Sequence, residues 1–175
     1  ADFYLALGDN VYADKRTVTA DGAVFETSLE QLSKAYSTQA NHAEFQAFLQ
    51  DVKVIPTWDD HDYGLNDAGS ELSFASESQA EFLTFWSIPK DDPRWNREGI
   101  YHSQLLSVEG RTIQVIVLDT RYFRSPLLAL ETPNAAPYGR DFSQDKTMLG
   151  EAQWAWLDGA LGINFLSGAA SGWIV

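Results

Sequence analysis

The chain of 175 residues contains no cysteine, which excludes disulfide bonds and thiolate metal ligands within it. Basic residues are also few, because 12 Lys and Arg stand against 25 Asp and Glu and leave a formal net charge of −13. We therefore expect no nucleic-acid-binding surface, since phosphate backbones require clustered Lys and Arg. Any phosphate group would have to be received by metal charge rather than by a basic face. No apolar run approaches the length of a transmembrane segment, and no signal peptide is visible.

The chain does contain enough apolar material for a buried core, with 45% hydrophobic and 13% aromatic residues. Strand-like runs alternate with segments of helical periodicity, which predicts an α/β fold with helices on both faces of a mixed β-sheet. The strand-like runs are 3–7, 52–57, 99–108 and 112–118, and the helical segments lie at 28–36, around 45–49, around 74–86 and at 151–161. The run 112–118 is nearly all apolar, so we expect it at the centre of the sheet.

Two short polar runs stand out, and each directly follows an apolar strand. They are Gly8-Asp9-Asn10-Val11-Tyr12-Ala13-Asp14 and Trp58-Asp59-Asp60-His61-Asp62-Tyr63. Either run alone is more typical of a turn or a solvated loop. Together they place five carboxylates, a histidine and a tyrosine at the carboxyl ends of strands, where open α/β sheets bind ligands. Such a cluster requires a cation, so the sequence predicts a metal site with a preference for Ca, Mn or Fe.

The residue types in these runs suggest phosphoryl chemistry. A carboxylate between two cations holds them about 3.5–4 Å apart, the separation used for in-line phosphoryl displacement. His61, when protonated, would donate a proton to the leaving-group oxygen, and we expect Asp62 to orient its imidazole. The adjacent Asp59 and Asp60 would point to opposite faces if strand geometry persists, so only one of them would reach a metal.

The remaining basic residues and histidines carry weaker signals. Arg121 and Arg124 follow a buried strand, and they either clamp phosphate oxygens or pair with structural acids. His42 and His102 are expected at the surface or in packing contacts rather than as metal ligands.

Four motifs, taken in chain order, resemble those of the alkaline phosphatase D (PhoD-like) metallophosphatases, which belong to the calcineurin-like and purple-acid-phosphatase-like metallophosphoesterases. They are Gly8-Asp9-x-x-Tyr12-x-Asp14, Trp58-Asp59-Asp60-His61-Asp62, Leu118-Asp119-Thr120-Arg121-x-x-Arg124 and Leu149-Gly150-x-x-Gln153-x-x-Trp156-Leu157. The resemblance implies a four-layer α/β/β/α sandwich of two mixed sheets flanked by helices. It also implies hydrolysis of phosphate mono- or diesters by a metal-activated hydroxide at a dinuclear or multinuclear centre.

The resemblance assigns roles to individual residues. Asp9 would bridge two metal ions, Tyr12 would bind an Fe(III)-type ion, and Asp60 rather than Asp59 would be a further metal ligand. His61 would face the scissile phosphate, while Asn10 and Arg121 are candidates for binding the substrate. The expected metals are Fe(III) with Ca, and Mn or Zn are alternatives. A secreted or periplasmic location is implied by the family alone.

We expect residues 1–175 to be a partial catalytic domain, incomplete at both ends. The ligand segment that opens such domains and the later Gly-Asp-x-His segment are both missing, so the isolated chain should be inactive. The final residues Gly172-Trp173-Ile174-Val175 read as the start of a buried strand. Two rival functions stay open: a non-catalytic calcium-binding or adhesive module, and a glycosidase with paired carboxylates and no metal dependence. The sequence determines neither the substrate nor the oligomeric state.

Overall fold

The structure is a computed structural model that describes residues 3–20, 22–130, 138–166 and 173–174. Every strand and helix expected above is present in it. The strands are β1 (Tyr4–Leu7), β2 (Lys15–Thr19), β3 (Gly22–Glu26), β4 (Val54–Thr57), β5 (His102–Val108), β6 (Arg111–Val117) and β7 (Trp173–Ile174). The helices are α1 (Leu29–Ala40), α2 (Ala43–Asp51), α3 (Asp60–Tyr63), α4 (Ala75–Phe85) and α5 (Gly150–Leu166), with a 3-10 turn at Pro93–Trp95.

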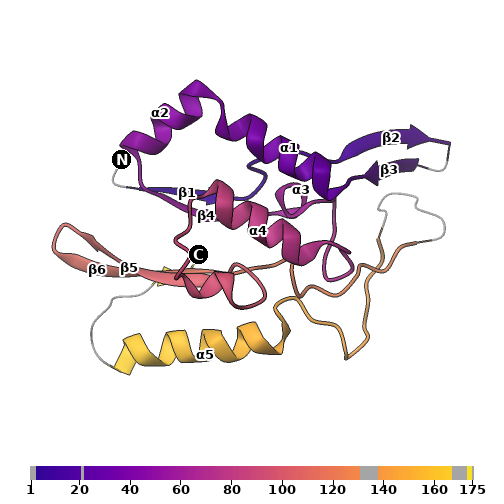
Figure 1. The fold of residues 1–175 in the computed structure, drawn as a ribbon. Helices are drawn as coiled ribbons and strands as arrows, with labels where there is room; N and C mark the ends of the chain where they lie inside the picture. Colours follow the sequence, from indigo (N-terminus) through magenta and orange to yellow (C-terminus); the bar gives the residue numbers. More distant parts are fainter. Residues whose placement is uncertain (1–2, 21, 131–137, 167–172, 175) are drawn as a thin grey trace.

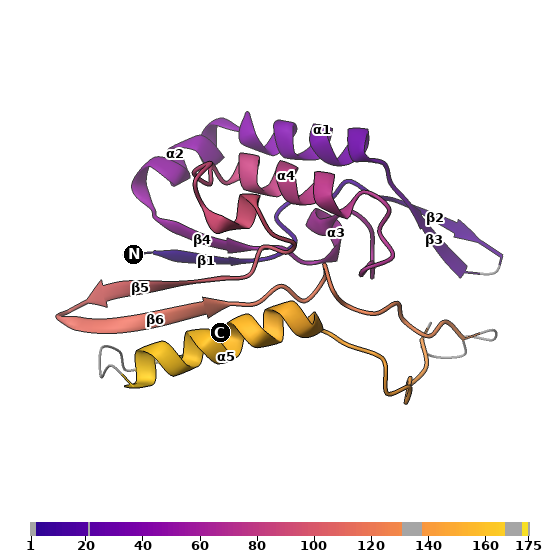
Figure 2. The same ribbon diagram turned by 60° about the horizontal axis from the view of Figure 1, so that its bottom comes forward.

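These elements lie in layers (Figures 1 and 2). Helices α1, α2 and α4 lie on one side of the parallel pair β1–β4, the hairpin β5–β6 lies on the other side, and α5 lies beyond the hairpin. A smaller apolar cluster lies between the two groups of strands, where Ile55 of β4 packs with Leu106, Val115 and Val117 of the hairpin. The mixed α/β architecture is therefore confirmed, whereas a complete four-layer sandwich stays a prediction.

Strand β6 is central in the three-stranded sheet β5–β6–β7, as its apolar sequence predicted. It pairs antiparallel with β5 and parallel with β7. The hairpin turn at Glu109 and Gly110 has positive φ at both residues, 49° and 75°, as tight hairpin turns require. The expected strand at the end of the chain is present as Trp173–Ile174, while Gly172 and Val175 lie outside the described residues.

The larger hydrophobic core lies between α1, α4 and the start of α3. Its members include Leu32, Trp58, Tyr63 and Phe82, each at most 2% exposed. Helix α1 begins at Ser28, whose side chain accepts a hydrogen bond from the Gln31 N–H at 3.3 Å. Leu32 and Tyr36 are the buried residues of α1 and share one face at i, i+4 spacing. The Tyr36 hydroxyl donates to the Asp62 carbonyl at 2.7 Å, so the core also fixes the second polar run.

The hairpin β2–β3, which projects from the body of the molecule in Figure 1, was not predicted from the sequence. Phe25 is the one residue of its two strands that is partly buried, and the others are exposed. Because neither strand has a buried face, the sequence shows no alternation from which the hairpin could be recognised. Among the described helices, none has both the length and the apolar character needed to cross a membrane.

Candidate metal centre

The two polar runs meet because the strands that precede them are parallel neighbours. In the register of this pair, Leu7 at the end of β1 lies opposite Thr57 at the end of β4. Gly8 has a φ of 108°, and a Cβ atom at this position would lie 2.5 Å from the Cβ atom of Asp59. Only glycine allows the first run to cross so closely over the second. The following residue, Asp9, has a left-handed φ of 53° that turns the chain along the sheet edge.

The candidate centre contains the four residues that were expected to converge. Ligand atoms of Asp9, Asp60 and His61 all lie within 4.8 Å of one another. The Tyr12 hydroxyl donates to Asp9 Oδ2 at 2.8 Å, and its ring centroid lies 4.3 Å from that of the His61 imidazole. The structure therefore brings together Asp9, Tyr12, Asp60 and His61, while their function as metal ligands and acid stays a prediction.

The donor set of this cluster fits a cation. Among the described residues, neither Asp9 nor Asp60 forms an ion pair with Lys or Arg, so the protein itself does not compensate their charge. The hydrogen bond to Asp9, the desolvation and the nearby carboxylates raise the pKa of Tyr12 to about 12. Carboxylate and phenol oxygens are hard donors that suit Ca, Mn and Fe, and an imidazole nitrogen also suits Fe.

His61 is held by Asp14, which is a correction to our expectation for Asp62. His61 Nδ1 lies 2.7 Å from Asp14 Oδ1, and the Asp14 side chain is only 2% exposed. Burial by itself lowers the pKa of His61, but the hydrogen bond and charge of Asp14, with the charges of Asp60 and Asp9, raise it overall. The imidazole is therefore oriented by a carboxylate of the first polar run, and Nε2 is its other nitrogen.

Asp62 instead connects the two polar runs through hydrogen bonds to residues of both. Its side chain is completely buried and accepts from the backbone N–H groups of Asp59 (2.6 Å), Asn10 (3.2 Å) and Asp9 (3.3 Å), and from the Asn10 side-chain amide. Burial raises the pKa of Asp62 to about 7, and these hydrogen bonds act in the opposite direction. The Asp59–Asp62 pair forms a capping box at the start of α3. That spacing was a signal in the sequence that would have predicted this inward position.

The segment after α3 holds Asp60 directly and supports His61 through Asp14. The backbone N–H of Asn66 donates to Asp14 Oδ2 at 3.0 Å, and the next N–H, that of Asp67, donates to Asp60 Oδ2 at 2.7 Å. Asp67 has a left-handed φ of 58°, and its carbonyl accepts a hydrogen bond from the buried Arg124 guanidinium. The backbone N–H groups of Asn66 and Asp67 thus fix the carboxylates of Asp14 and Asp60. These contacts were not predicted from the sequence.

The two candidate substrate-binding residues are engaged within the protein. The Asn10 side-chain amide donates to the Thr57 carbonyl at 3.0 Å as well as to Asp62. Arg121 Nε donates to Asp59 Oδ1 at 2.7 Å, which is the pairing with a structural acid that the sequence left open. Asp59 is thereby directed to Arg121 while Asp60 joins the centre, so the adjacent acids diverge.

The two later motifs interlock behind the centre. Asp119 is completely buried and accepts four hydrogen bonds of 2.9 Å, from the Trp58 indole and the backbone N–H groups of Ile100, Arg121 and Tyr122. The side chain of Gln153 on α5 donates to the Asp119 carbonyl and accepts from its N–H, both at 2.8 Å. Together these contacts position Arg121 beside Asp59.

The fold and the cluster define a mixed α/β protein with a candidate metal centre at the carboxyl ends of two parallel strands. The family model for PhoD-like phosphatases matches residues 1–165, and the chain therefore belongs to the PhoD-like phosphatase family. A solved structure entitled "Structure of PhoD" matches with a TM-score of 0.59 and 20% identity, a likeness that shows the fold alone. The match covers 91% of this chain and 34% of that chain. A comparison with curated proteins gave no significant match.

Proposed function

We propose that this protein is a metal-dependent phosphoric ester hydrolase that cleaves phosphate mono- or diesters at a dinuclear or multinuclear centre. The observation that carries the proposal is the convergence of Asp9 and Asp60 carboxylate oxygens with a ring nitrogen of His61 within 4.8 Å, together with the pairing of that imidazole with the carboxylate of Asp14. Membership of the PhoD-like phosphatase family supports phosphoester hydrolysis as the reaction class. The remaining ligands would come from segments outside residues 1–175, so this chain alone should be inactive.

In this proposal the oxygens of Asp9, Tyr12 and Asp60 would hold the metal ions. The phenol oxygen of Tyr12 favours a trivalent ion such as Fe(III), and the carboxylates suit Ca, with Mn or Zn as alternatives. When bound, such ions lower the pKa of a coordinated water to form hydroxide and polarise the phosphoryl oxygens.

The chain's own proton donor in this proposal is His61. Because Asp14 engages Nδ1, the Nε2 nitrogen is left to donate a proton to the leaving-group oxygen, a contribution of roughly 10²–10⁴-fold. Asp14 acts through His61 and is a positioning residue. Asp62 has no contact with the imidazole among the described residues and instead maintains the turn that carries Asp9.

The alternative function is a calcium-binding structural module, in which the same carboxylates would bind calcium. It needs carboxylates but no oriented imidazole, so the Asp14–His61 pair favours the enzyme. A secreted or periplasmic location is also part of the proposal, and it rests on the family resemblance.

The test uses the full-length protein and measures hydrolysis of 4-nitrophenyl phosphate and bis(4-nitrophenyl) phosphate. Chelation should abolish activity, and Fe(III) with Ca, or Mn, should restore it. His61→Asn should lower kcat by roughly 10²–10⁴-fold, whereas the control His42→Asn, at an exposed histidine paired with Glu44, should leave kcat unchanged. Full activity in metal-free protein would rule out the metal mechanism. Metal binding with no hydrolysis of either ester in the wild type would support the structural module.

A further inference from the structure

The hairpin β2–β3 adjoins the candidate metal centre at its base. Strand β2 begins at Lys15, directly after the Asp14 that pairs with His61. In the register of the hairpin, Arg16 lies opposite Phe25, so Phe25 is at the end of the hairpin next to the centre and not at its turn. The Phe25 ring centroid lies 6.3 Å from that of the His61 imidazole, and the two rings are tilted by 55°. The hairpin therefore brings an aromatic ring to the candidate proton donor.

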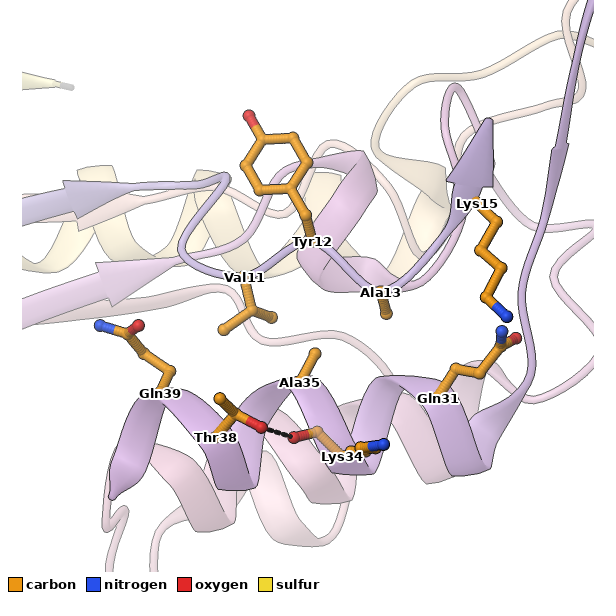
Figure 3. Close-up of a pocket in the computed structure, with 9 residues that line it drawn as sticks. All are labelled: Val11, Tyr12, Ala13, Lys15, Gln31, Lys34, Ala35, Thr38 and Gln39. Atoms are coloured by element: carbon orange, nitrogen blue, oxygen red, sulfur yellow. Dashed lines mark hydrogen bonds between the residues drawn. The ribbon is translucent and has the colours of Figure 1, made fainter. Parts of the chain in front are cut away.

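The alternation of side chains along β2 agrees with this contact. Figure 3 shows the Lys15 side chain directed toward helix α1, whereas the Tyr12 ring points away from that helix. Successive side chains of a strand point to opposite faces, and residues directly opposite each other in a strand pair share a face. Arg16 and its partner Phe25 are therefore on the face of the hairpin that is turned away from α1. Tyr12, which also points away from α1, contacts the same imidazole at a centroid distance of 4.3 Å.

Phe25 is not part of a hydrophobic core. Among the described residues it belongs to neither of the two apolar clusters, although it is the one partly buried residue in the strands of an otherwise exposed hairpin. The His61 side chain beside it keeps 16% of its surface exposed. The two rings thus form a surface that a ligand can reach, and the apolar part of this surface is the Phe25 ring.

We propose that Phe25 is a specificity-determining residue that contacts the leaving group, and that the preferred substrates are phosphate esters of an alcohol carrying an aromatic ring. The inference rests on the proposed function, in which His61 gives a proton to the leaving-group oxygen. Because Asp14 engages Nδ1, that oxygen must come within about 3 Å of Nε2. The organic group bonded to this oxygen is then within reach of Phe25, and ring pairs are favourable at centroid separations of about 4.5–7 Å.

The experiment compares benzyl phosphate with ethyl phosphate in the full-length holoenzyme, because the two leaving alcohols are similar in acidity and differ in the aromatic ring. Their methyl diesters replace them if the wild type cleaves only diesters. The wild type should prefer the benzyl ester in kcat/KM, and Phe25→Ala should reduce this preference about tenfold. Phe25→Tyr retains the ring and should keep most of the preference. Val24→Ala is the matched control, because Val24 is the exposed neighbour on the other face of β3 and should not change the ratio.

Binding of benzylphosphonate and methylphosphonate, measured by calorimetry, gives a second readout that needs no hydrolysis. Phe25→Ala should weaken benzylphosphonate binding about tenfold and leave methylphosphonate binding unchanged. Hydrolysis of both esters with an unchanged ratio in Phe25→Ala would overturn the inference and leave the proposed function standing. Equal losses for both esters would do the same, because they are the result expected if Phe25 only holds the imidazole. Absence of hydrolysis, with benzylphosphonate binding still dependent on Phe25, would overturn the proposed function and support the contact.

Discussion

At the scale of single residues, the contacts of His61 decide how the candidate centre would work. Its Nδ1 is bonded to a carboxylate that is almost fully buried and that is itself fixed by the Asn66 N–H. A carboxylate held from both sides cannot follow the imidazole if it moves, so the ring orientation is set before any ligand binds.

This geometry predicts the effect of Asp14→Asn in the full-length protein. The amide cannot accept from both the imidazole and the Asn66 N–H, so one contact is lost and the ring is less well oriented. We expect kcat for phosphate ester hydrolysis to fall about 10–100-fold, while metal affinity measured by calorimetry stays close to that of the wild type. Asp51→Asn, at an exposed acid, is the control. An unchanged kcat in the Asp14 variant would contradict the positioning function.

The close crossing at Gly8 gives a second prediction at this scale. Gly8→Ala combines a left-handed φ of 108° with a Cβ contact of 2.5 Å to Asp59, so we expect a loss of at least about 2 kcal/mol in unfolding free energy. The matched substitution Gly110→Ala meets a φ of 75° but no atom within 4 Å, and should cost only about 1 kcal/mol. Urea denaturation of both variants measures the difference, and equal losses would show that the contact is relieved by relaxation.

At the scale of elements, two motifs whose contacting residues, Asp119 and Gln153, are 34 positions apart act as one structural unit. Asp119 at the exit of β6 accepts four hydrogen bonds, and Gln153 of α5 binds both backbone groups of the same residue. The unit connects β6, α5 and the segment before β5, and it holds Arg121 against Asp59. Its function is therefore structural support of the second polar run.

Asp119→Asn tests this unit. An amide in place of the carboxylate turns one acceptor into a donor facing N–H groups, which leaves buried donors without partners. We expect the unfolding free energy to fall by about 2–4 kcal/mol, measured by urea denaturation. Thr120→Ala, at the exposed neighbouring position, should change it by less than about 0.5 kcal/mol. Similar values for the two variants would refute the structural assignment of Asp119.

At the scale of the whole molecule, stability should depend on pH through a partly buried histidine outside the candidate centre. Burial, and then the charge of Arg94, lower the pKa of His102 from about 6.5 to about 4. Arg94 lies 3.2 Å from His102 Nδ1 and also pairs with Asp92. The folded protein therefore favours the neutral form of the His102 imidazole.

The sign of this effect follows from proton binding. Below pH 6.5 the unfolded chain protonates His102 while the folded protein does not, so stability is lost as the pH falls from 6.5 towards 4. His102 should contribute a loss of about 2 kcal/mol between pH 7 and pH 5. In His102→Gln this part of the pH dependence should disappear, whereas His42→Gln should retain it. Parallel stability curves for the wild type and His102→Gln would contradict the prediction.

The sequence by itself determined most of the elements and the place of the candidate centre. Helical periodicity and alternating or continuous apolar runs are local signals, and they predicted α1, α4, the hairpin β5–β6 and the central position of β6. The two polar runs after apolar strands indicated where the centre lies, because parallel strands carry their ends to one edge, and the family resemblance selected Asp9, Tyr12, Asp60 and His61 within those runs.

The tertiary structure decided which groups contact one another at that edge. Asp14 pairs with His61 although 47 positions separate them, and α3 turns Asp62 away from the imidazole and under the first run. The exposed hairpin β2–β3 and the contact of Phe25 with His61 also emerged only there. The physical reason is that periodicity reports which face of an element is buried, whereas the partner of a side chain depends on strand register and backbone turns formed between distant segments.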